Sequence, residues 1–133
     1  MTCISAGQSL VALGSKDGRI HVYESSSDFR CLRLIAILAH HTKAIHTIIF
    51  QDGKILSGSD DMSVGIVNIS NADGSLMLVK LLQGHVSRVR ALDCEADKVL
   101  SGSDDRCVKL WSIEPGQSSF KDMLKTSFFL HAN

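Results

Sequence analysis

The sequence predicts an all-β chain built from three repeated units, each folding as a small sheet of four strands. Two observations support this fold class. The pentapeptide Ser-Gly-Ser-Asp-Asp stands at 57–61 and again at 101–105, and the same shift of 44 residues aligns 38–67 with 82–111 without a gap. Short runs rich in branched residues recur within the units, and no stretch keeps apolar residues at helical spacing over three turns.

The repeat extends beyond the pentapeptide and reaches the N-terminal part of the chain. Ten positions of the alignment are identical, five of them outside the pentapeptide. A second shift of 44 residues sets 10–23 against 54–67 and pairs Asp17 with Asp61. Three copies at one period indicate stacked structural units.

Each unit divides into the same series of strands. We expect strands in the second unit at 33–39, 44–50, 54–59 and 63–69, and in the third at 76–83, 87–94, 98–103 and 107–113. The only proline, Pro115, lies outside these runs, which suits strands because proline removes a ladder donor. Several inner runs are apolar on both faces, as expected when neighbouring sheets cover them. Four such strands in every 44 residues are typical of the blades of a β-propeller.

Composition excludes several classes of protein. The 133 residues suit a single domain, and 44% hydrophobic content is that of a globular chain. Fourteen basic and fourteen acidic residues balance, so charge favours neither nucleic acid nor an anionic membrane as a partner. The longest apolar run, at 34–39, is too short to cross a bilayer, and the first ten residues lack a secretory signal. We therefore expect an intracellular protein, cytoplasmic or nuclear.

The four cysteines, Cys3, Cys31, Cys94 and Cys107, include no Cys-x-x-Cys pair. We interpret them as buried apolar thiols in a reducing compartment, in preference to disulfides or metal ligands.

The third unit resembles a WD repeat. Gly84 and His85 open it, the pentapeptide stands at its hairpin, and Trp111 closes its third strand. The resemblance implies a buried hydrogen-bonded tetrad, which in this unit consists of His85, Ser101, Asp105 and Trp111. A buried polar group without a partner costs about 1–3 kcal/mol, so a closed network would hold the sheet in one register.

The other two units match the tetrad only in part. The matching residues are His41, Ser57 and Asp61 in the second unit and Asp17 in the first. Val67 replaces the tryptophan in the second unit, and Leu13 and Tyr23 stand at the serine and tryptophan positions of the first. His40 replaces the glycine before the histidine of the second unit, and we expect it to have a loop or surface role.

These units divide the chain into four segments. They are a partial first WD repeat with its following outer strand (1–37), a second repeat (38–81), a third repeat (82–117), and a C-terminal tail or start of an incomplete blade (118–133). Because closed propellers usually hold four to eight blades, we expect a partial propeller that forms an incomplete or open arc of about three. Three explanations stay open: a piece of a longer propeller, closure by self-association, or completion by strands of a partner.

The polar residues do not predict catalysis. His40 and His41 are adjacent and His46 follows five residues later, but no further ligands converge, so we expect neither a metal nor a cofactor. No histidine–serine–aspartate arrangement in the sequence carries the signature of an activated nucleophile. The glycine-containing segment at 14–18 lacks the spacing of a phosphate loop and precedes a strand.

WD-repeat propellers generally act as rigid platforms for other proteins, and they bind through the loops that enter the first strands and through the tight turns. The residues that the resemblance places on this face are Arg88, Arg90, His46, Asp60, Asp104 and Lys16. Arg88 and Arg90 have the same parity on a strand, so they would present two guanidinium groups together to an acidic or phosphorylated segment. The alternative is that they are solvated or pair with Asp104.

We therefore expect a non-catalytic protein–protein interaction scaffold, as a fragment or short form of a larger propeller. A truncated product without independent binding and the substrate-binding part of a ubiquitin-ligase-type adaptor are the alternatives, and an enzyme is the most distant one.

Overall fold

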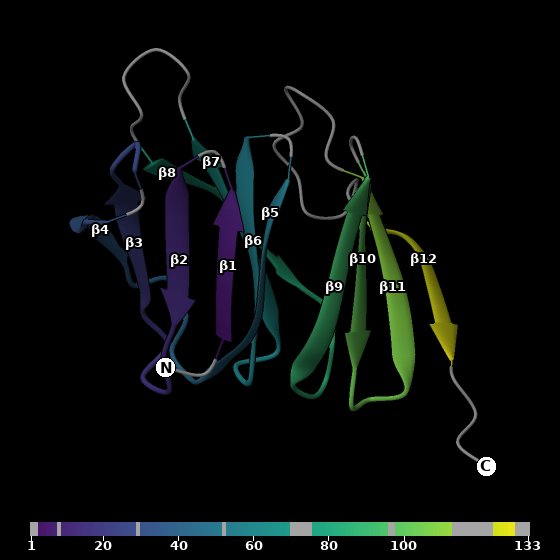
Figure 1. Ribbon diagram of the computed structural model, residues 1–133. Coiled ribbons are helices and arrows are strands. Elements are labelled where there is room, and N and C mark those ends of the chain that lie inside the picture. Colours follow the sequence, from purple (N-terminus) through teal and green to yellow (C-terminus); the bar gives the residue numbers. More distant parts are fainter. Residues whose placement is uncertain are drawn as a thin grey trace.

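The computed structural model consists of three antiparallel four-stranded sheets that follow one another along the chain (Figure 1). The structure describes residues 3–7, 9–28, 30–51, 53–69, 76–95, 98–112 and 124–129. The first sheet contains β1 (Cys3–Gly7), β2 (Leu10–Gly14), β3 (Ile20–Ser25) and β4 (Leu32–Leu38). The second contains β5 (Ile45–Gln51), β6 (Lys54–Ser59), β7 (Ser63–Ile69) and β8 (Leu76–Gln83). The third contains β9 (Val89–Glu95), β10 (Lys98–Ser103), β11 (Cys107–Ser112) and β12 (Leu124–Phe129).

Each sheet is a meander in which consecutive strands pair. The strand that stands first in each sequence repeat closes the preceding sheet in space, because β4 pairs with β3 and β8 pairs with β7. In the same way β12 pairs with β11, with Phe129 opposite Cys107. Residues 124–129, which lie in the segment expected to be a tail or the start of an incomplete blade, thus form the outer strand of the third sheet.

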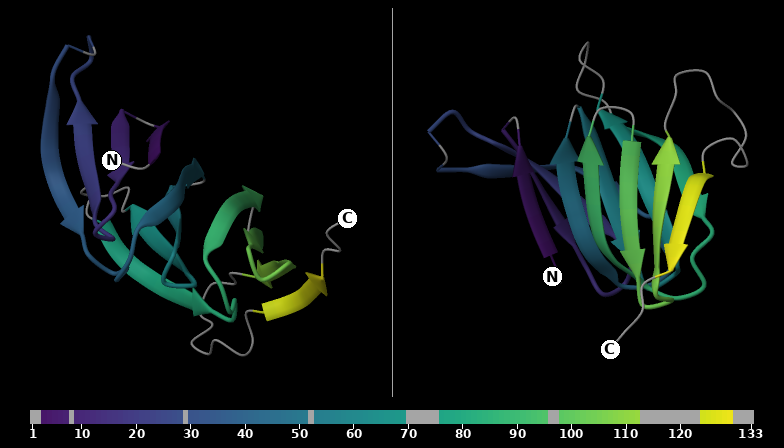
Figure 2. Two further views of the ribbon diagram at one scale, coloured as in Figure 1. Left: turned by 90° about the horizontal axis from the view of Figure 1, so that it is seen from below. Right: turned by 90° about the vertical axis from the view of Figure 1, so that its right-hand side faces the viewer.

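The sheets stack face to face in an open arc (Figure 2, left). Successive sheets contact one another through their first strands, β1 with β5 and β5 with β9. The fourth strands β4, β8 and β12 form the outer ends of the sheets (Figure 2). The predicted fold class, an all-β partial propeller of three four-stranded blades, is confirmed.

Two apolar layers fill the spaces between the sheets. The layer between the first and second sheets is built from Ala12, Ile20, Val22, Ile45, Ile48, Ile55 and Val67. The layer between the second and third is built from Leu56, Val64, Ile66, Leu82, Val89, Cys94, Val99 and Trp111. The middle sheet therefore has both faces covered, and this is why its inner strands are apolar on both sides.

Irregularities recur at the same position of every sheet. The pairing between the third and fourth strands shifts register between Val22 and Tyr23, between Ile66 and Val67, and between Leu110 and Trp111. The hairpin between the second and third strands ends in a residue of left-handed conformation, which is Gly18 (φ 87°), Met62 (φ 72°) or Arg106 (φ 66°). In the second and third sheets this residue closes a three-residue loop, a common hairpin geometry that follows the twist of the strands.

The cysteines differ in exposure. Cys94 and Cys107 are buried and Cys3 is half-buried, but Cys31 is exposed. The expectation that all four are buried is therefore wrong for Cys31.

Candidate interaction face

A buried hydrogen-bonded chain connects the four tetrad residues of the third sheet. The indole Nε1–H of Trp111 donates to Ser101 Oγ over 2.8 Å. Ser101 Oγ lies 2.7 Å from His85 Nε2, and His85 Nδ1 lies 2.9 Å from Asp105 Oδ2. One proton arrangement satisfies every group: the serine hydroxyl donates to Nε2, and Nδ1–H donates to the carboxylate. The network therefore ties the loop before β9 to β10, to the hairpin turn and to β11.

Asp105 is the charged residue at the end of this hydrogen-bonded network. Burial raises the pKa of its carboxyl, but hydrogen bonds from the Val86 N–H, from His85 and from the Cys107 N–H outweigh burial and lower the pKa to about 2. The carboxylate thus stays ionised in its turn, and it fixes the backbone on both sides of the hairpin.

The second sheet builds a similar network around His41. His41 Nδ1 lies 2.9 Å from Asp61 Oδ2, and His41 Nε2 lies 2.7 Å from Ser57 Oγ. Ser63 adds a further hydroxyl 3.1 Å from His41 Nδ1. Burial lowers the pKa of His41, although the nearby Asp61 carboxylate opposes this. Burial raises the pKa of Asp61, but hydrogen bonds from Ser63, the Thr42 N–H and His41 lower it overall.

His40 also contributes to this second network. Its Nε2 lies 3.2 Å from Ser57 Oγ, and its ring centroid lies 4.5 Å from that of His41. His40 thus lies in a loop, as expected, but its ring is half-buried against the network and does not lie on the open surface. Sequence comparison missed it because no other unit carries a histidine at this position.

The first sheet has only the turn portion of the network. Asp17 Oδ1 accepts from the Arg19 N–H over 3.2 Å and also contacts the Ser15 hydroxyl. The Asp17 side chain is 55% exposed and pairs with the Arg19 guanidinium. Its tetrad partners are replaced by Leu13 and Tyr23, so Asp17 holds the turn without a buried histidine.

The turns are anchored to the loops that enter the first strand of the same sheet. Ser59 Oγ donates toward the carbonyls of Lys43 and Ala44, and Ser103 Oγ donates to the Ser87 carbonyl over 3.1 Å. Asp60 N–H donates to the Ala44 carbonyl over 2.8 Å, which brings the Asp60 side chain beside the start of β5.

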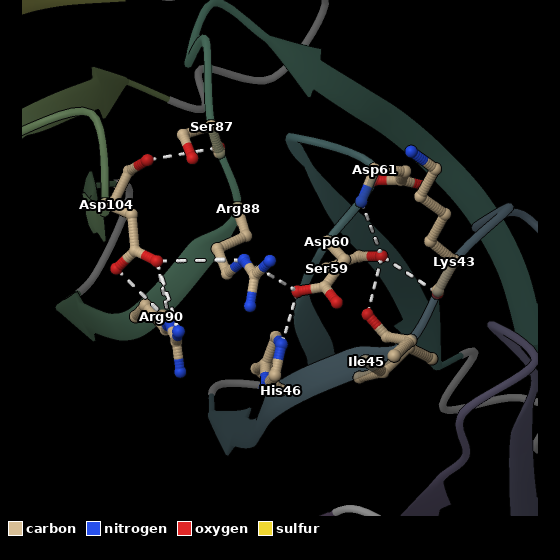
Figure 3. A network of polar contacts seen from close by, with 12 residues as sticks. Lys43, Ile45, His46, Ser59, Asp60, Asp61, Ser87, Arg88, Arg90 and Asp104 are labelled. Carbon is tan, nitrogen blue, oxygen red and sulfur yellow. Dashed lines mark hydrogen bonds and ion pairs between the residues drawn. The ribbon is translucent and has the colours of Figure 1, made fainter.

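Five of the six residues expected on the binding face form one cluster (Figure 3). We call this cluster the charged face; it consists of His46, Asp60, Arg88, Arg90 and Asp104. His46 Nε2 pairs with Asp60 Oδ1. Arg90 Nε lies 3.2 Å from both Asp104 oxygens, and its Nη2 lies 3.1 Å from Oδ2. In the structure both arginines thus pair with Asp104, as the alternative interpretation expected.

Arg88 connects the two sheets across this face. Its Nε lies 3.7 Å from Asp60 Oδ1 on the second sheet and 3.7 Å from Asp104 Oδ2 on the third (Figure 3). No pattern in the sequence indicates the contact with Asp60, because the repeat relates equivalent positions and not neighbouring blades. Lys16 occupies the corresponding turn of the first sheet, but the described residues place no carboxylate in an ion pair with it.

Other kinds of site find little support in the described ranges. Histidine, cysteine, aspartate and glutamate side chains there do not gather in groups of three or more that could hold a metal ion. The same ranges contain no long apolar helix of the kind that spans a bilayer.

Comparisons with known proteins agree with this geometry. A family model described as "WD domain, G-beta repeat" matches residues 32–68 and 73–112. A comparison with curated proteins gave no significant match. Among solved structures, the computationally designed Ika4 protein is 24% identical with a TM-score of 0.78, and the alignment covers 98% of this chain and 72% of that one.

Two further solved structures show the same fold. The WD40 β-propeller domain of Doa1 is 25% identical with a TM-score of 0.71, and the alignment covers 94% of this chain and 39% of that one. A chain of the Mitotic Checkpoint Complex is 17% identical with a TM-score of 0.74, with 96% and 38% covered. This chain therefore spans less than two fifths of the length of either. Since the family model covers more than half of its residues, the protein belongs to the WD-repeat family.

Proposed function

We propose that this chain is a non-catalytic protein-interaction scaffold and that it binds partners through the charged face. The observation that carries the proposal is the position of that face. Its side chains project from turns and strand entries that buried networks and two apolar layers hold in place. A rigid support lowers the entropic cost of binding, because the recognising groups are ordered beforehand.

The charge pattern of the face suits an acidic or phosphorylated segment. Arg88 and Arg90 are 46% and 49% exposed, so both guanidinium groups reach solvent. The Arg88 contacts of 3.7 Å are longer than a hydrogen bond, so its N–H groups remain able to turn toward an incoming anion. A carboxylate or phosphate would bond such a group in bidentate fashion, in competition with Asp60 and Asp104, the two carboxylates that face Arg88.

A peptide titration tests this binding mode. Three labelled peptides of one sequence carry paired phosphoserines, paired glutamates or paired serines, and fluorescence anisotropy measures their binding. We expect the phosphorylated peptide to bind best. Replacing Arg88→Gln together with Arg90→Gln should weaken its binding by about tenfold, roughly 1.4 kcal/mol.

The control variant is Arg33→Gln, because Arg33 is an exposed arginine paired with Glu24 on the outer strand β4, away from the charged face. It should bind as the parent does. If the parent binds all three peptides equally, or if the double variant keeps its affinity while its circular dichroism is unchanged, the charged face is not the binding site.

We also propose that the chain acts as a piece or short form of a larger propeller, either within a longer chain or through self-association. Gly14 and Gly58 each lie against a branched residue on the first strand of the next sheet, Ile45 and Val89. Among the described residues, a Cβ at the equivalent Gly102 would meet only Ala91, at 3.8 Å from the alanine Cβ. The space beside Gly102 corresponds to the space that the first strand of the next sheet fills at Gly14 and Gly58, which supports the proposal that another blade packs there.

A truncated product without independent binding is the second candidate, and the uncovered sheet faces favour it. Ile4 on the first sheet is 59% exposed and Leu100 on the third is 42% exposed, whereas Leu56, the equivalent of Leu100 on the covered second sheet, is fully buried. A ubiquitin-ligase-type adaptor is a narrower form of the scaffold proposal. It predicts that a captured partner becomes a substrate of ubiquitin transfer.

The networks resemble a serine–histidine–aspartate triad in their distances, but their burial argues against catalysis. Ser57 and Ser101 have no exposed surface, so a substrate carbonyl has no approach to either hydroxyl. We therefore propose a structural role for both networks.

A further inference from the structure

We propose that His40 takes the place of the tryptophan in the second sheet as donor to the network serine, and that this substitution makes the contact between the first and second sheets sensitive to acid.

Three positions differ together between the two networks. Relative to the third sheet, the second has His40 in place of Gly84, Gly65 in place of Lys109 and Val67 in place of Trp111. In the third sheet the far edge of the Trp111 ring lies over Gly84, with Cη2 3.1 Å from the position of a Cβ there. In the second sheet Val67 leaves that space open, and the His40 ring enters from the position where the glycine would be.

Gly65 makes room for the imidazole. A Cβ at this position would overlap His40 Nε2 and lie 2.7 Å from His40 Cδ2 and 2.8 Å from Ser57 Oγ. Such contacts are too short for any side chain, so the ring is seated against the backbone of β7. The three replacements therefore depend on one another: in the second sheet the large side chain comes from the loop before β5, as His40, and in the third sheet it comes from β11, as Trp111.

The proton arrangement supports the exchange. In the third sheet the serine accepts from an indole N–H and donates to the histidine. In the second sheet Ser57 can make the same pair of bonds only if His40 Nε2 carries a proton, since His41 Nε2 accepts from the serine hydroxyl. The neutral Nε2–H form of His40 therefore reproduces the indole donor, but an imidazole, unlike an indole, can gain a further proton as the pH falls.

A second proton on His40 is disfavoured here. Burial lowers the pKa of His40 to about 4, the neighbouring His41 acts in the same direction, and Asp61 opposes them. His41 and Asp61 are the titratable groups that face the ring from its own loop and from the hairpin turn. On β6 and β7 the facing residues, Ser57 and Gly65, are uncharged, and on the first sheet the nearest turn carries the ion pair of Asp17 with Arg19.

The direction of the pH effect follows from this lowered pKa. The unfolded chain protonates His40 near its ordinary value of 6.5, whereas the folded chain resists protonation until about pH 4. The stabilisation is therefore complete above pH 6.5 and is lost progressively as the pH falls from 6.5 to about 4.

The loop that carries His40 is also the loop that holds the first sheet. Ile45 N–H donates to the Ser15 carbonyl over 3.1 Å, and Gly18 packs against the carbonyls of His41 and Lys43. Displacing this loop would loosen the contact between the first and second sheets, while the third sheet keeps its tryptophan.

A histidine titration of the folded chain tests the proposal directly. The imidazole Cε1–H signals in NMR spectra give the protonation midpoint of each histidine, assigned by the variant His40→Gln. We expect the His40 midpoint near pH 4, well below the ordinary value of 6.5. A midpoint near 6.5 would show that the ring is solvated and would overturn the proposal.

Urea unfolding at pH 7 and pH 5 supplies the second measurement. The amide of Gln can donate to Ser57 but does not titrate, so His40→Gln should lose less stability between the two pH values than the parent. The control His21→Gln removes a histidine from β3, outside the network, and should lose as much stability as the parent. Equal losses in the parent and His40→Gln would contradict the proposal.

A triple variant covers the case in which His40→Gln fails to fold. Changing His40→Gly, Gly65→Lys and Val67→Trp together installs the arrangement of the third sheet in the second. This variant should fold at pH 7 and should lose less stability than the parent at pH 5. Loss of folding in the triple variant, together with a normal titration of His40 in the parent, would reject the equivalence of the two networks.

Discussion

Every residue of the repeated pentapeptide has its own contact. In the second copy Ser57 and Asp61 bond the buried histidine, Gly58 lies where the first strand of the next sheet passes, Ser59 ties the turn to the preceding loop, and Asp60 reaches the charged face. The pentapeptide therefore recurs because one turn serves the network, the stacking of the sheets and the surface together.

The sequence predicts the roles of some residues of the networks and of the charged face but not of others. The histidine, serine and aspartate positions follow from equivalent places in the repeat, and the structure brings them within hydrogen-bond distance. His40 could not be predicted, because its role depends on the space left by a residue 27 positions later, Val67. The contact between Arg88 and Asp60 could not be predicted either, since it joins non-equivalent positions of adjacent units.

The indole N–H gives a testable contribution at the residue scale. Trp111→Phe removes the donor to Ser101 and leaves a buried acceptor without a partner, so we expect a loss of about 1–3 kcal/mol in the free energy of unfolding. Urea unfolding followed by far-UV circular dichroism measures it. Tyr23→Phe is the matched control, because Tyr23 occupies the equivalent position in the first sheet without a network serine, and it should change stability by less than about 0.5 kcal/mol. Equal effects of the two changes would show that the indole bond contributes nothing specific.

At the scale of strands and sheets, the repeat predicts the elements well but not their grouping. The strands at 54–59, 63–69 and 76–83 were expected at the bounds that β6, β7 and β8 have. Their alternation and turn residues are local signals, so the sequence contains them. The assignment of each outer strand to the preceding sheet depends on pairing across a register shift, which no local pattern encodes.

Glycines on the second strands test the stacking of the sheets. A Cβ on Gly58 would lie 2.7 Å from Val89 Cγ1 and 2.9 Å from Thr47 Cγ2, so Gly58→Ala should destabilise the chain by about 1–3 kcal/mol. Gly102→Ala is the matched control at the equivalent position, where a Cβ would have room. It should be neutral or stabilising by up to about 1 kcal/mol. Thermal unfolding compares them, and a similar destabilisation by both changes would contradict the stacking described here.

At the scale of the whole molecule, the described residues cover both faces of the middle sheet but only one face of the first and of the third sheet. The outer face of the third sheet exposes Leu100, and that of the first exposes Ile4. Inside the arc, the face of one sheet that corresponds to the exposed face of the third sheet packs on the face of the next sheet that corresponds to the exposed face of the first. An association of unlike faces closes a ring if the rotation fits.

Light scattering tests whether these faces associate. The parent should show a mass above 14.4 kDa that rises with protein concentration, because apolar faces of this kind are buried wherever two sheets meet. Leu100→Lys should reduce the association. Met77→Lys, at a side chain 70% exposed on the outer strand β8, should leave it unchanged. A constant mass of 14.4 kDa for a folded parent would exclude self-association as the way in which the arc is completed.

The central claim is that three WD blades form one folded body able to support a binding face. Urea unfolding at pH 7, followed in one sample by far-UV circular dichroism and by fluorescence, tests it most directly. The tryptophan fluorescence reports on the layer between the second and third sheets, because Trp111 is the only tryptophan in the chain and lies in that layer. We predict a single cooperative transition at which both signals change together. A gradual change without a transition, or a fluorescence change well separated from the loss of strand signal, would contradict this claim.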